Sequence, residues 1–279
     1  MFKVLEKTQL SESVFELKVE APEIARKVKA GQFLIVRMCE HSERVPFTFS
    51  DWSAEEGWIK FIFMRVGKTS HMLSHVEKHG ELLDVAGPLG HPTDVTDKKR
   101  IAVVGGGVGS AVAYPVARAL CEQGAEVTVI EGARNEELLI LRKEFEQLPL
   151  KDYIIMTDDG SAGKKGLVTA PLKELCEAGE LDNTFIVGPA IMMKFAALTT
   201  AEYNVPTVVS LNPIMVDGTG MCGACRVSIH GETRFGCVDG PDFDAAGVNW
   251  DELMNRQRVY VDDERLADAE YSRSCSCHS

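Results

Sequence analysis

The chain has 279 residues, of which 45% are hydrophobic, and its 30 basic and 42 acidic side chains give a net charge of −12. This length predicts two or three domains with apolar cores, and the acidic balance argues against nucleic-acid binding, which needs a basic face. No apolar run approaches the roughly 20 residues of a membrane span, and the first ten residues lack the apolar stretch of a secretory signal.

Residues 1–96 alternate apolar and polar positions in short runs that glycines and polar turns separate. The clearest runs are residues 14–19, 33–38 and 58–64. Strands of this length and spacing predict a small antiparallel β-barrel or sandwich. Residues 87–92, rich in glycine and proline, are expected to form a linker to the next domain.

Residues 98–210 change to alternating strand and helix patterns, which predict an α/β domain with a parallel sheet. Strands are expected at residues 100–105, 127–130, 153–156, 184–187 and 207–211, and a helix at residues 111–124.

A glycine-rich turn follows the first of these strands and precedes the helix. It consists of Gly105, Gly106, Gly107, Val108 and Gly109. In this context backbone N–H groups and the helix N-terminus can face a pyrophosphate, which favours a dinucleotide site. Because Ser110 stands where the last glycine of the usual motif would be, a tight turn without a ligand is the alternative.

Residues 211–279 contain the densest cysteine pattern of the chain, with Cys222, Cys225 and Cys237 close together. Plant-type [2Fe–2S] clusters use the spacing C-x4-C-x2-C…C, and Asp217 stands at the position of the first cysteine. The pattern therefore predicts a [2Fe–2S] cluster held by three thiolates and one carboxylate. Structural zinc is the alternative, because a pair of cysteines two residues apart also serves zinc.

The other cysteines and the histidines suggest no second metal site. Cysteines in a chain without a secretory signal are expected to be reduced, which places the protein in the cytoplasm. Cys39, Cys121 and Cys176 are expected to be buried and inert, and Cys275, Cys277 and His278 to form a frayed tail, with docking on a partner as the alternative. His71, His75 and His79 are spaced to share one helix face at the surface.

The order of barrel, α/β domain and cysteine segment resembles the ferredoxin–NADP reductase superfamily. The cysteine segment is similar to that of the electron-transfer subunits of dihydroorotate dehydrogenase. It is more similar to the small (alpha) subunits of NADH-dependent reduced ferredoxin:NADP oxidoreductases, the sulfide dehydrogenase beta subunit type, which also place an Asp at one cluster position. The resemblance implies an FAD-binding barrel over residues 1–96, an NAD-binding domain over residues 98–210 and a cluster segment over residues 211–279.

The resemblance also implies two flavin elements. The first is the strand with Arg44, Val45, Pro46, Phe47 and Thr48, in which the Arg would meet phosphate, the aromatic ring would lie against the flavin and the hydroxyl would approach its N5. The alternative for Phe47 is an ordinary core aromatic. In the second, Gly67, Thr69 and Ser70 would face the FAD pyrophosphate, while Phe63 and Met64 would lie beside the cofactor through their backbone. An N-capped helix without a ligand is the alternative there.

For the nicotinamide nucleotide, the resemblance points to the loops after the second and third strands of the α/β domain. These carry Glu131, Arg134, Asp158 and Asp159. Carboxylates repel a 2′-phosphate but accept hydrogen bonds from a ribose diol, which favours NAD(H) over NADP(H), although Arg134 argues the other way. Gly188, Pro189 and Met192 resemble the loop that closes near the nicotinamide.

The function that follows is electron transfer between NAD(H), FAD and the cluster, with FAD converting two-electron into one-electron steps. The resemblance implies a larger flavoprotein partner with [4Fe–4S] clusters, and with it electron bifurcation involving ferredoxin. The electron-transfer subunit of a dihydroorotate dehydrogenase is the second hypothesis. A zinc-stabilised nucleotide-binding interaction subunit is the third.

Overall fold

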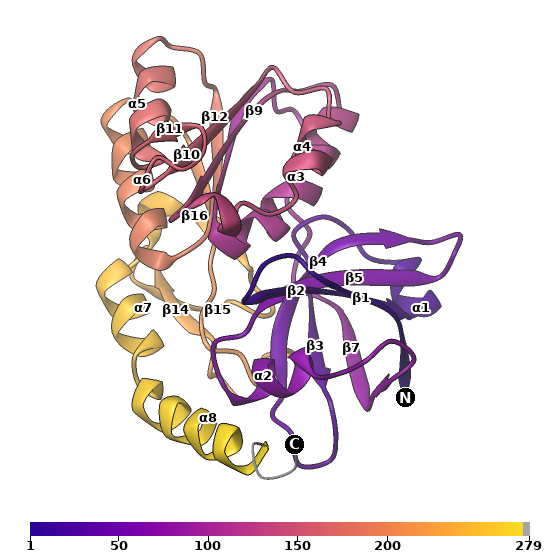
Figure 1. The fold of residues 1–279 in the computed structure, drawn as a ribbon. Coiled ribbons are helices and arrows are strands. Elements are labelled where there is room, and N and C mark those ends of the chain that lie inside the picture. Colours follow the sequence, from indigo (N-terminus) through magenta and orange to yellow (C-terminus); the bar gives the residue numbers. More distant parts are fainter. Residues whose placement is uncertain (276–279) are drawn as a thin grey trace.

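The computed structural model describes residues 1–275, with side chains described as far as Arg273. It has a β-barrel, an α/β domain and a C-terminal segment that runs along both (Figure 1). The predictions for Cys275, Cys277 and His278 lie outside the described side chains.

The barrel is a nearly closed antiparallel sheet of seven strands in the order β6-β1-β2-β5-β4-β3-β7. Its elements are β1 Phe2–Gln9, β2 Val14–Glu20, α1 Pro22–Ala25, β3 Phe33–Arg37, β4 Val45–Ser53, β5 Trp58–Met64, α2 Lys68–Ser74, β6 Glu81–Leu82 and β7 Asp84–Leu89. Alternate side chains of these strands point inward, as the sequence pattern predicts, and residues such as Leu17, Phe61 and Phe63 fill the interior.

The α/β domain is a second seven-stranded sheet, in the order β11-β10-β9-β8-β12-β13-β16. Its strands are β8 Arg100–Gly106, β9 Glu126–Ala133, β10 Asp152–Thr157, β11 Lys164–Lys165, β12 Asn183–Val187 and β13 Thr207–Ser210. Its helices are α3 Ser110–Glu122, α4 Arg142–Glu146, α5 Thr169–Glu177 and α6 Ala190–Glu202, with short 3₁₀ turns η1 Gly107–Gly109 and η2 Glu136–Leu138. Helices α3 and α4 cover one face of the sheet, and α5 and α6 cover the other. The strands are therefore buried on both faces, which explains their continuous apolar runs.

The C-terminal segment contains the hairpin β14 Arg226–Ile229 and β15 Glu232–Phe235, then β16 Asp242–Asp244, η3 Ala245–Gly247, α7 Trp250–Gln257 and α8 Val261–Cys275. Strand β16 pairs antiparallel with β13, so this segment completes the edge of the α/β sheet. Helix α8 (yellow in Figure 1) runs back beside α2 of the barrel, where His71 Nδ1 lies 3.2 Å from Asp268 Oδ1.

Three local predictions are wrong. Residues 87–92 are not wholly a linker, because β7 continues through Leu89 and pairs there with Phe33. Cys39 is exposed and not buried, since β3 ends two residues before it. His79 does not share a helix face with His71, because α2 ends at Ser74 and His79 has a φ of 71°.

Among the described residues 1–275, no helix combines the length and the apolar character that crossing a bilayer requires.

Candidate functional site

The glycine-rich turn lies where the strand order of the α/β sheet reverses direction. Strand β8 pairs with β9 on one side and β12 on the other, so the chain leaves β8 and β12 toward opposite faces. A crevice opens at such a switch point, outside the carboxyl ends of the strands, and nucleotides bind there in open α/β sheets. Residues 105–109 occupy the end of β8, and Gly188 and Pro189 follow the end of β12.

The turn and the loop after β12 approach too closely for side chains. A Cβ on Gly109 would lie 2.7 Å from the carbonyl oxygen of Val187, and one on Gly106 would overlap the thioether of Met192. The structure thus brings the predicted residues Gly106, Gly188 and Met192 into one site. At Gly109 the clash is with backbone, so only glycine permits the approach there, and the backbone of the turn can face a phosphate.

Glu131 is the predicted nucleotide residue that the structure places differently from its neighbours. It pairs with Gly105 across the sheet but is only 1% exposed, and Tyr153 donates its hydroxyl hydrogen to Glu131 Oε2. Burial raises the pKa of Glu131 to about 7, although the hydroxyl groups of Tyr153 and Ser110 act to lower it. Tyr153 forms the hydrogen bond to the carboxyl group, while Glu131 Oε1 and the nearby Ser110 Oγ are buried without a hydrogen-bond partner. The Glu131 carboxyl group is therefore buried on the strand next to β8 and held by Tyr153 of β10.

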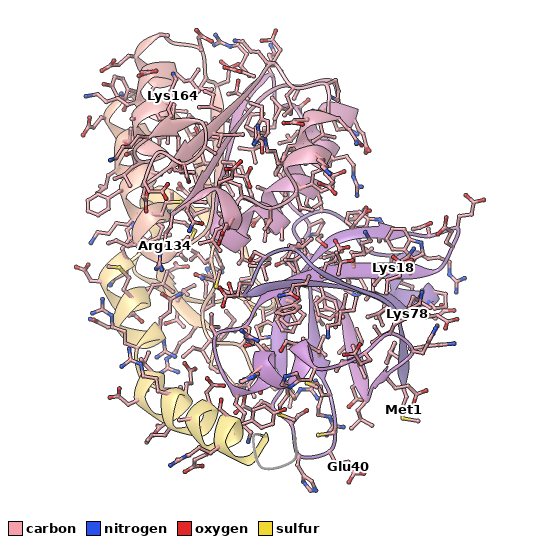
Figure 2. All side chains as sticks on the ribbon, viewed as in Figure 1. Met1, Lys18, Glu40, Lys78, Arg134 and Lys164 are labelled. Atoms are coloured by element: carbon pink, nitrogen blue, oxygen red, sulfur yellow. The ribbon has the colours of Figure 1, made fainter. Side chains whose placement is uncertain are left out.

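The loops after β9 and β10 are tied together at the surface. Asp159 N donates to the carbonyl of Arg134 at 3.3 Å, and Glu136 N donates to Ser161 Oγ at 2.8 Å. Ser161 Oγ also donates to Asp159 Oδ1 at 2.6 Å, and this contact holds the pKa of Asp159 below its usual value. The Asp158 side chain is exposed beside them, and Figure 2 labels Arg134 at the edge of the α/β domain.

Strand β4 carries the first predicted flavin element. Its register with β3 is regular from Val45 to Thr48, so Val45 and Phe47 point to one face and Pro46 and Thr48 to the other. The Phe47 ring stacks on Phe61 with centroids 5.1 Å apart, which makes it half-buried at the rim of the barrel core. Its packing accords with the core-aromatic alternative as well as with a flavin contact.

The second predicted flavin element is a tight turn before α2. Val66 N and Gly67 N donate to Ser70 Oγ at 3.0 and 3.1 Å, and Ser70 Oγ donates to the carbonyl of Gly67. Thr69 Oγ1 donates to Glu43 Oε2 at 2.5 Å. Both hydroxyls are therefore engaged within the protein, and the sequence pattern gave no signal for Glu43. Phe63 is buried and Met64 half-buried at the end of β5 nearby.

The cluster segment brings two of its three cysteines together in an apolar pocket. Cys225 and Cys237 are each 2% exposed, and their Sγ atoms lie 3.1 Å apart. Burial and the neighbouring Cys225 thiol raise the pKa of Cys237 to about 12. Phe33, Ile35 and Met215 pack around the pair, so this pocket is closed by the barrel and not by the cysteine segment alone.

The loop before these cysteines turns through glycines and exposes Cys222. Gly218, Gly220 and Gly223 have φ of 81°, 84° and 67°, values that other residues rarely adopt. Backbone amides of Ala224 and Asp217 lower the pKa of the Cys222 thiol. Amide donors that stabilise thiolates are what an iron–sulfur cluster requires of its loop, so the donor set fits such a cluster.

Asp217 is turned into its own loop. Its Oδ2 accepts hydrogen bonds from Thr219 N at 2.9 Å, Thr219 Oγ1 at 2.5 Å and Met221 N at 3.2 Å. These bonds, with a contribution from Arg44, hold the pKa of Asp217 below its usual value. Among the side chains that the structure describes, up to Arg273, no three of His, Cys, Asp or Glu converge in the arrangement of a metal site. The structure thus pairs Cys225 with Cys237, while Cys222 and Asp217 lie in the same loop without joining them.

Two family models match the chain. Residues 212–249 match the iron-sulfur cluster binding domain of dihydroorotate dehydrogenase B, and residues 103–197 match the oxidoreductase NAD-binding domain. Relatives align over nearly the whole length. One from Thermotoga maritima, a homolog of the dihydroorotate dehydrogenase B (NAD(+)) electron transfer subunit, is 44% identical over 95% of this chain and 93% of its own. Such a subunit from Desulforamulus reducens is 34% identical over 89% of this chain and 97% of its own. The chain belongs to the family of the dihydroorotate dehydrogenase B electron transfer subunits and their homologs.

Solved structures agree with the family assignment. A chain of NADH-dependent reduced ferredoxin-NADP oxidoreductase, a structure described for flavin-based electron bifurcation, is 42% identical with a TM-score of 0.91, over 97% of this chain and 98% of that one. Amycolatopsis cytochrome P450 reductase, 19% identical with a TM-score of 0.62 over 73% of this chain and 66% of its own, shares the fold alone. The predicted resemblance, the fold class and the presence of NAD-binding and iron–sulfur domains in an oxidoreductase subunit are therefore confirmed.

Proposed function

We propose that this chain carries electrons between NAD(H), an FAD on the barrel and a [2Fe–2S] cluster, and delivers them to a larger flavoprotein subunit. The observation that supports this most is the meeting of the glycine turn with Gly188 and Met192 at the switch point of the α/β sheet. Family members are electron-transfer subunits by name, which accords with a partner that completes the reaction.

The proposed function uses three sites: a nucleotide site, a flavin site and a cluster site. The amides of residues 105–109 would bind the nucleotide pyrophosphate, and the loops with Arg134 and Asp158 would select NAD(H). Strand β4, with Phe47 and Thr48, would orient the flavin, which supplies the change from two-electron to one-electron transfer. Cys222, Cys225, Cys237 and Asp217 would hold the cluster, and the apolar packing of Phe33 and Ile35 would exclude water from it.

Within this proposal we favour electron bifurcation with ferredoxin and a partner that carries [4Fe–4S] clusters. The support is the 42% identity to the NADH-dependent reduced ferredoxin-NADP oxidoreductase chain, together with Asp217 at the position of the first cysteine of the cluster motif. The second candidate is the electron-transfer subunit of a dihydroorotate dehydrogenase, which the names of several relatives support. A cytoplasmic location, proposed from the cysteine content, accords with both.

The test is an absorption spectrum of protein purified without oxygen, before and after NADH, with iron, zinc and flavin measured on the same sample. Flavin and cluster bands that bleach with NADH are expected, with about two iron atoms per chain. A colourless protein that contains zinc would overturn the proposal and favour a zinc-stabilised nucleotide-binding subunit. If the bands do bleach with NADH, a second experiment separates the two redox candidates. The reduced protein is mixed with the catalytic subunit of a dihydroorotate dehydrogenase or of a ferredoxin:NADP oxidoreductase, and the subunit that accepts the electrons identifies the partner.

A further inference from the structure

The strand that carries the predicted flavin motif also forms a charged contact with helix α3 of the nucleotide-binding domain. At the far end of β4, Asp51 Oδ1 accepts a hydrogen bond of 2.7 Å from Arg118 Nη1 on α3. The guanidinium carbon of Arg118 lies 5.0 Å from the ring centroid of Trp52 and 5.5 Å from that of Tyr114. One side chain of the α/β domain is therefore held by a carboxylate and an aromatic ring of the barrel.

Both partners of this contact belong to elements that begin at a cofactor motif. Strand β4 starts with Val45, Phe47 and Thr48, and α3 starts directly after the glycine turn at residues 107–109. Neither element is a straight rod, because the register of β4 is irregular between Phe49 and Asp51 and α3 contains Pro115. Helix α3 nevertheless packs against β4, so the contact between Arg118 and Asp51 helps to hold the near ends of the two elements, where the two cofactors are proposed to meet.

The environment keeps this contact charged and directional. The side chains of Arg118 and Asp51 are 25% and 30% exposed. Burial opposes the charge on Arg118, but the hydrogen bond and attraction of Asp51 outweigh it and raise the pKa of Arg118, with Glu122 adding to the effect. A planar guanidinium that is both hydrogen-bonded and stacked has one preferred orientation, which a lysine ammonium does not have.

A polar contact also links Thr93 to β16, where Thr93 Oγ1 donates to Asp242 Oδ2 at 2.5 Å, but the other contacts near α3 are apolar. Val14 and Ile62 of the barrel form one buried cluster with Ala111 and Ile140 of the α/β domain. Trp52 packs against the cores of both domains. Apolar contacts hold surfaces together but are not directional. Loss of the Arg118 contact is therefore expected to change the angle between the domains without separating them.

We propose that Arg118 is a positioning residue that sets the alignment of the nicotinamide site with the flavin site across the domain interface. The inference rests on the proposed function. Misplacing reacting groups by about 1 Å costs on the order of 100-fold in rate. Small rotations at this interface are therefore expected to affect the transfer step more than the binding of either cofactor.

The test compares Arg118→Met, which retains the apolar stem, with the matched control Arg100→Met. Arg100 also pairs with a carboxylate, Asp182 at 2.6 Å, but both residues lie within the α/β domain. For Arg118→Met, we expect the limiting rate of flavin reduction by NADH to fall by about 10- to 100-fold. Flavin content, iron content and the Kd for NAD are expected to stay within about threefold of the wild type, and Arg100→Met to leave the rate unchanged. Arg118→Lys is expected to recover part of the rate, since it retains the charge without the stacking.

Hydrogen–deuterium exchange of β4 and α3 provides a readout that does not depend on electron transfer. Faster exchange in both elements of Arg118→Met, and not of Arg100→Met, is expected. An unchanged rate together with unchanged exchange in a folded Arg118→Met protein would overturn the inference, as would a loss explained entirely by weaker nucleotide binding. If NADH fails to reduce the flavin of the wild type, the proposed function fails, and unchanged exchange would still refute the domain contact separately.

Discussion

The Sγ atoms of Cys225 and Cys237 lie 3.1 Å apart because a β-hairpin returns the chain to its starting point. Strands β14 and β15 pair Arg226 with Phe235, and Gly236 N donates to the carbonyl of Cys225 at 3.0 Å. The pair is thus assembled by backbone hydrogen bonds. Both thiols must lose their protons to bind iron, so cluster assembly is expected to release protons and to weaken at low pH.

The role of Asp217 can be separated into metal ligation and loop stabilisation. Asp217→Asn retains an acceptor oxygen for Thr219 N and Met221 N but removes the negative charge, whereas Asp217→Ala removes both. If Asp217 is a ligand, both variants are expected to lose most of the iron and the cluster absorption. Iron analysis and the visible spectrum measure this.

Thr219→Val is the control for Asp217, because it removes a hydroxyl that donates to the carboxylate but no proposed ligand. It is expected to keep its iron. Full iron content in Asp217→Asn with loss only in Asp217→Ala would assign Asp217 to the loop and leave the fourth cluster ligand to be found elsewhere.

Glu131 is expected to make stability depend on pH. Its pKa is raised from 4.5 to about 7 by burial, so between these values the folded protein binds more protons than the unfolded chain. The free energy of unfolding therefore falls as pH rises through this window and levels off above it. Denaturant unfolding at pH 5 and pH 8 is expected to show a loss about 2–3 kcal/mol larger in the wild type than in Glu131→Gln.

Other groups titrate in the same window, but they are common to both proteins in this comparison. Arg142 is the nearby cation and Tyr153 the hydrogen-bond donor to Glu131, and neither changes in Glu131→Gln. Glu137→Gln, an exposed carboxylate on the following loop, is expected to retain the wild-type pH dependence. Equal pH dependence in Glu131→Gln and the wild type would show that Glu131 is ionised throughout.

Gly106 is expected to be intolerant of a methyl group because of Met192. In Gly106→Ala the new Cβ overlaps the Met192 thioether and meets Pro189 Cδ at 3.2 Å. Either the end of the Met192 side chain or the turn must then move, and the Kd for NAD is expected to rise by about tenfold, or about 1.4 kcal/mol, where the turn moves. Calorimetric titration with NAD measures the change.

The double variant Gly106→Ala with Met192→Ala is the matched test of that cause. Removing the thioether makes room for the methyl group, so part of the lost affinity is expected to return. No recovery in the double variant would mean that the methyl group acts on the nucleotide itself and not through Met192.

The exposed Asp158 is expected to contribute to a preference for NADH over NADPH. Because Asp159 is engaged by Ser161, Asp158 is the carboxylate free to accept from a ribose or to repel a 2′-phosphate. We expect kcat/KM to favour NADH by at least about tenfold and Asp158→Ser to reduce that ratio. Equal kcat/KM for both nucleotides in the wild type would refute the preference.

Much of the fold followed from local sequence patterns. Alternation identified β2 and β5, and continuous apolar runs before glycines identified β8 and β12, because burial on one or two faces imposes these periods directly on the sequence. Errors were confined to segment ends. Cys39 lies just past the end of β3, where the pattern no longer predicts burial, and His79 lies in the turn between α2 and β6, which the histidine spacing did not reveal.

The sequence by itself determined the glycine turn, the cysteine spacing and the order of the domains, since each depends on residues close together in the chain. Only the tertiary structure decided that Glu131 is buried beside Gly105, that Phe33 and Ile35 pack against the cysteine pair and that Arg118 reaches Asp51. These contacts join segments far apart in the chain. They depend on strand register and domain packing, which one-dimensional periodicity does not encode.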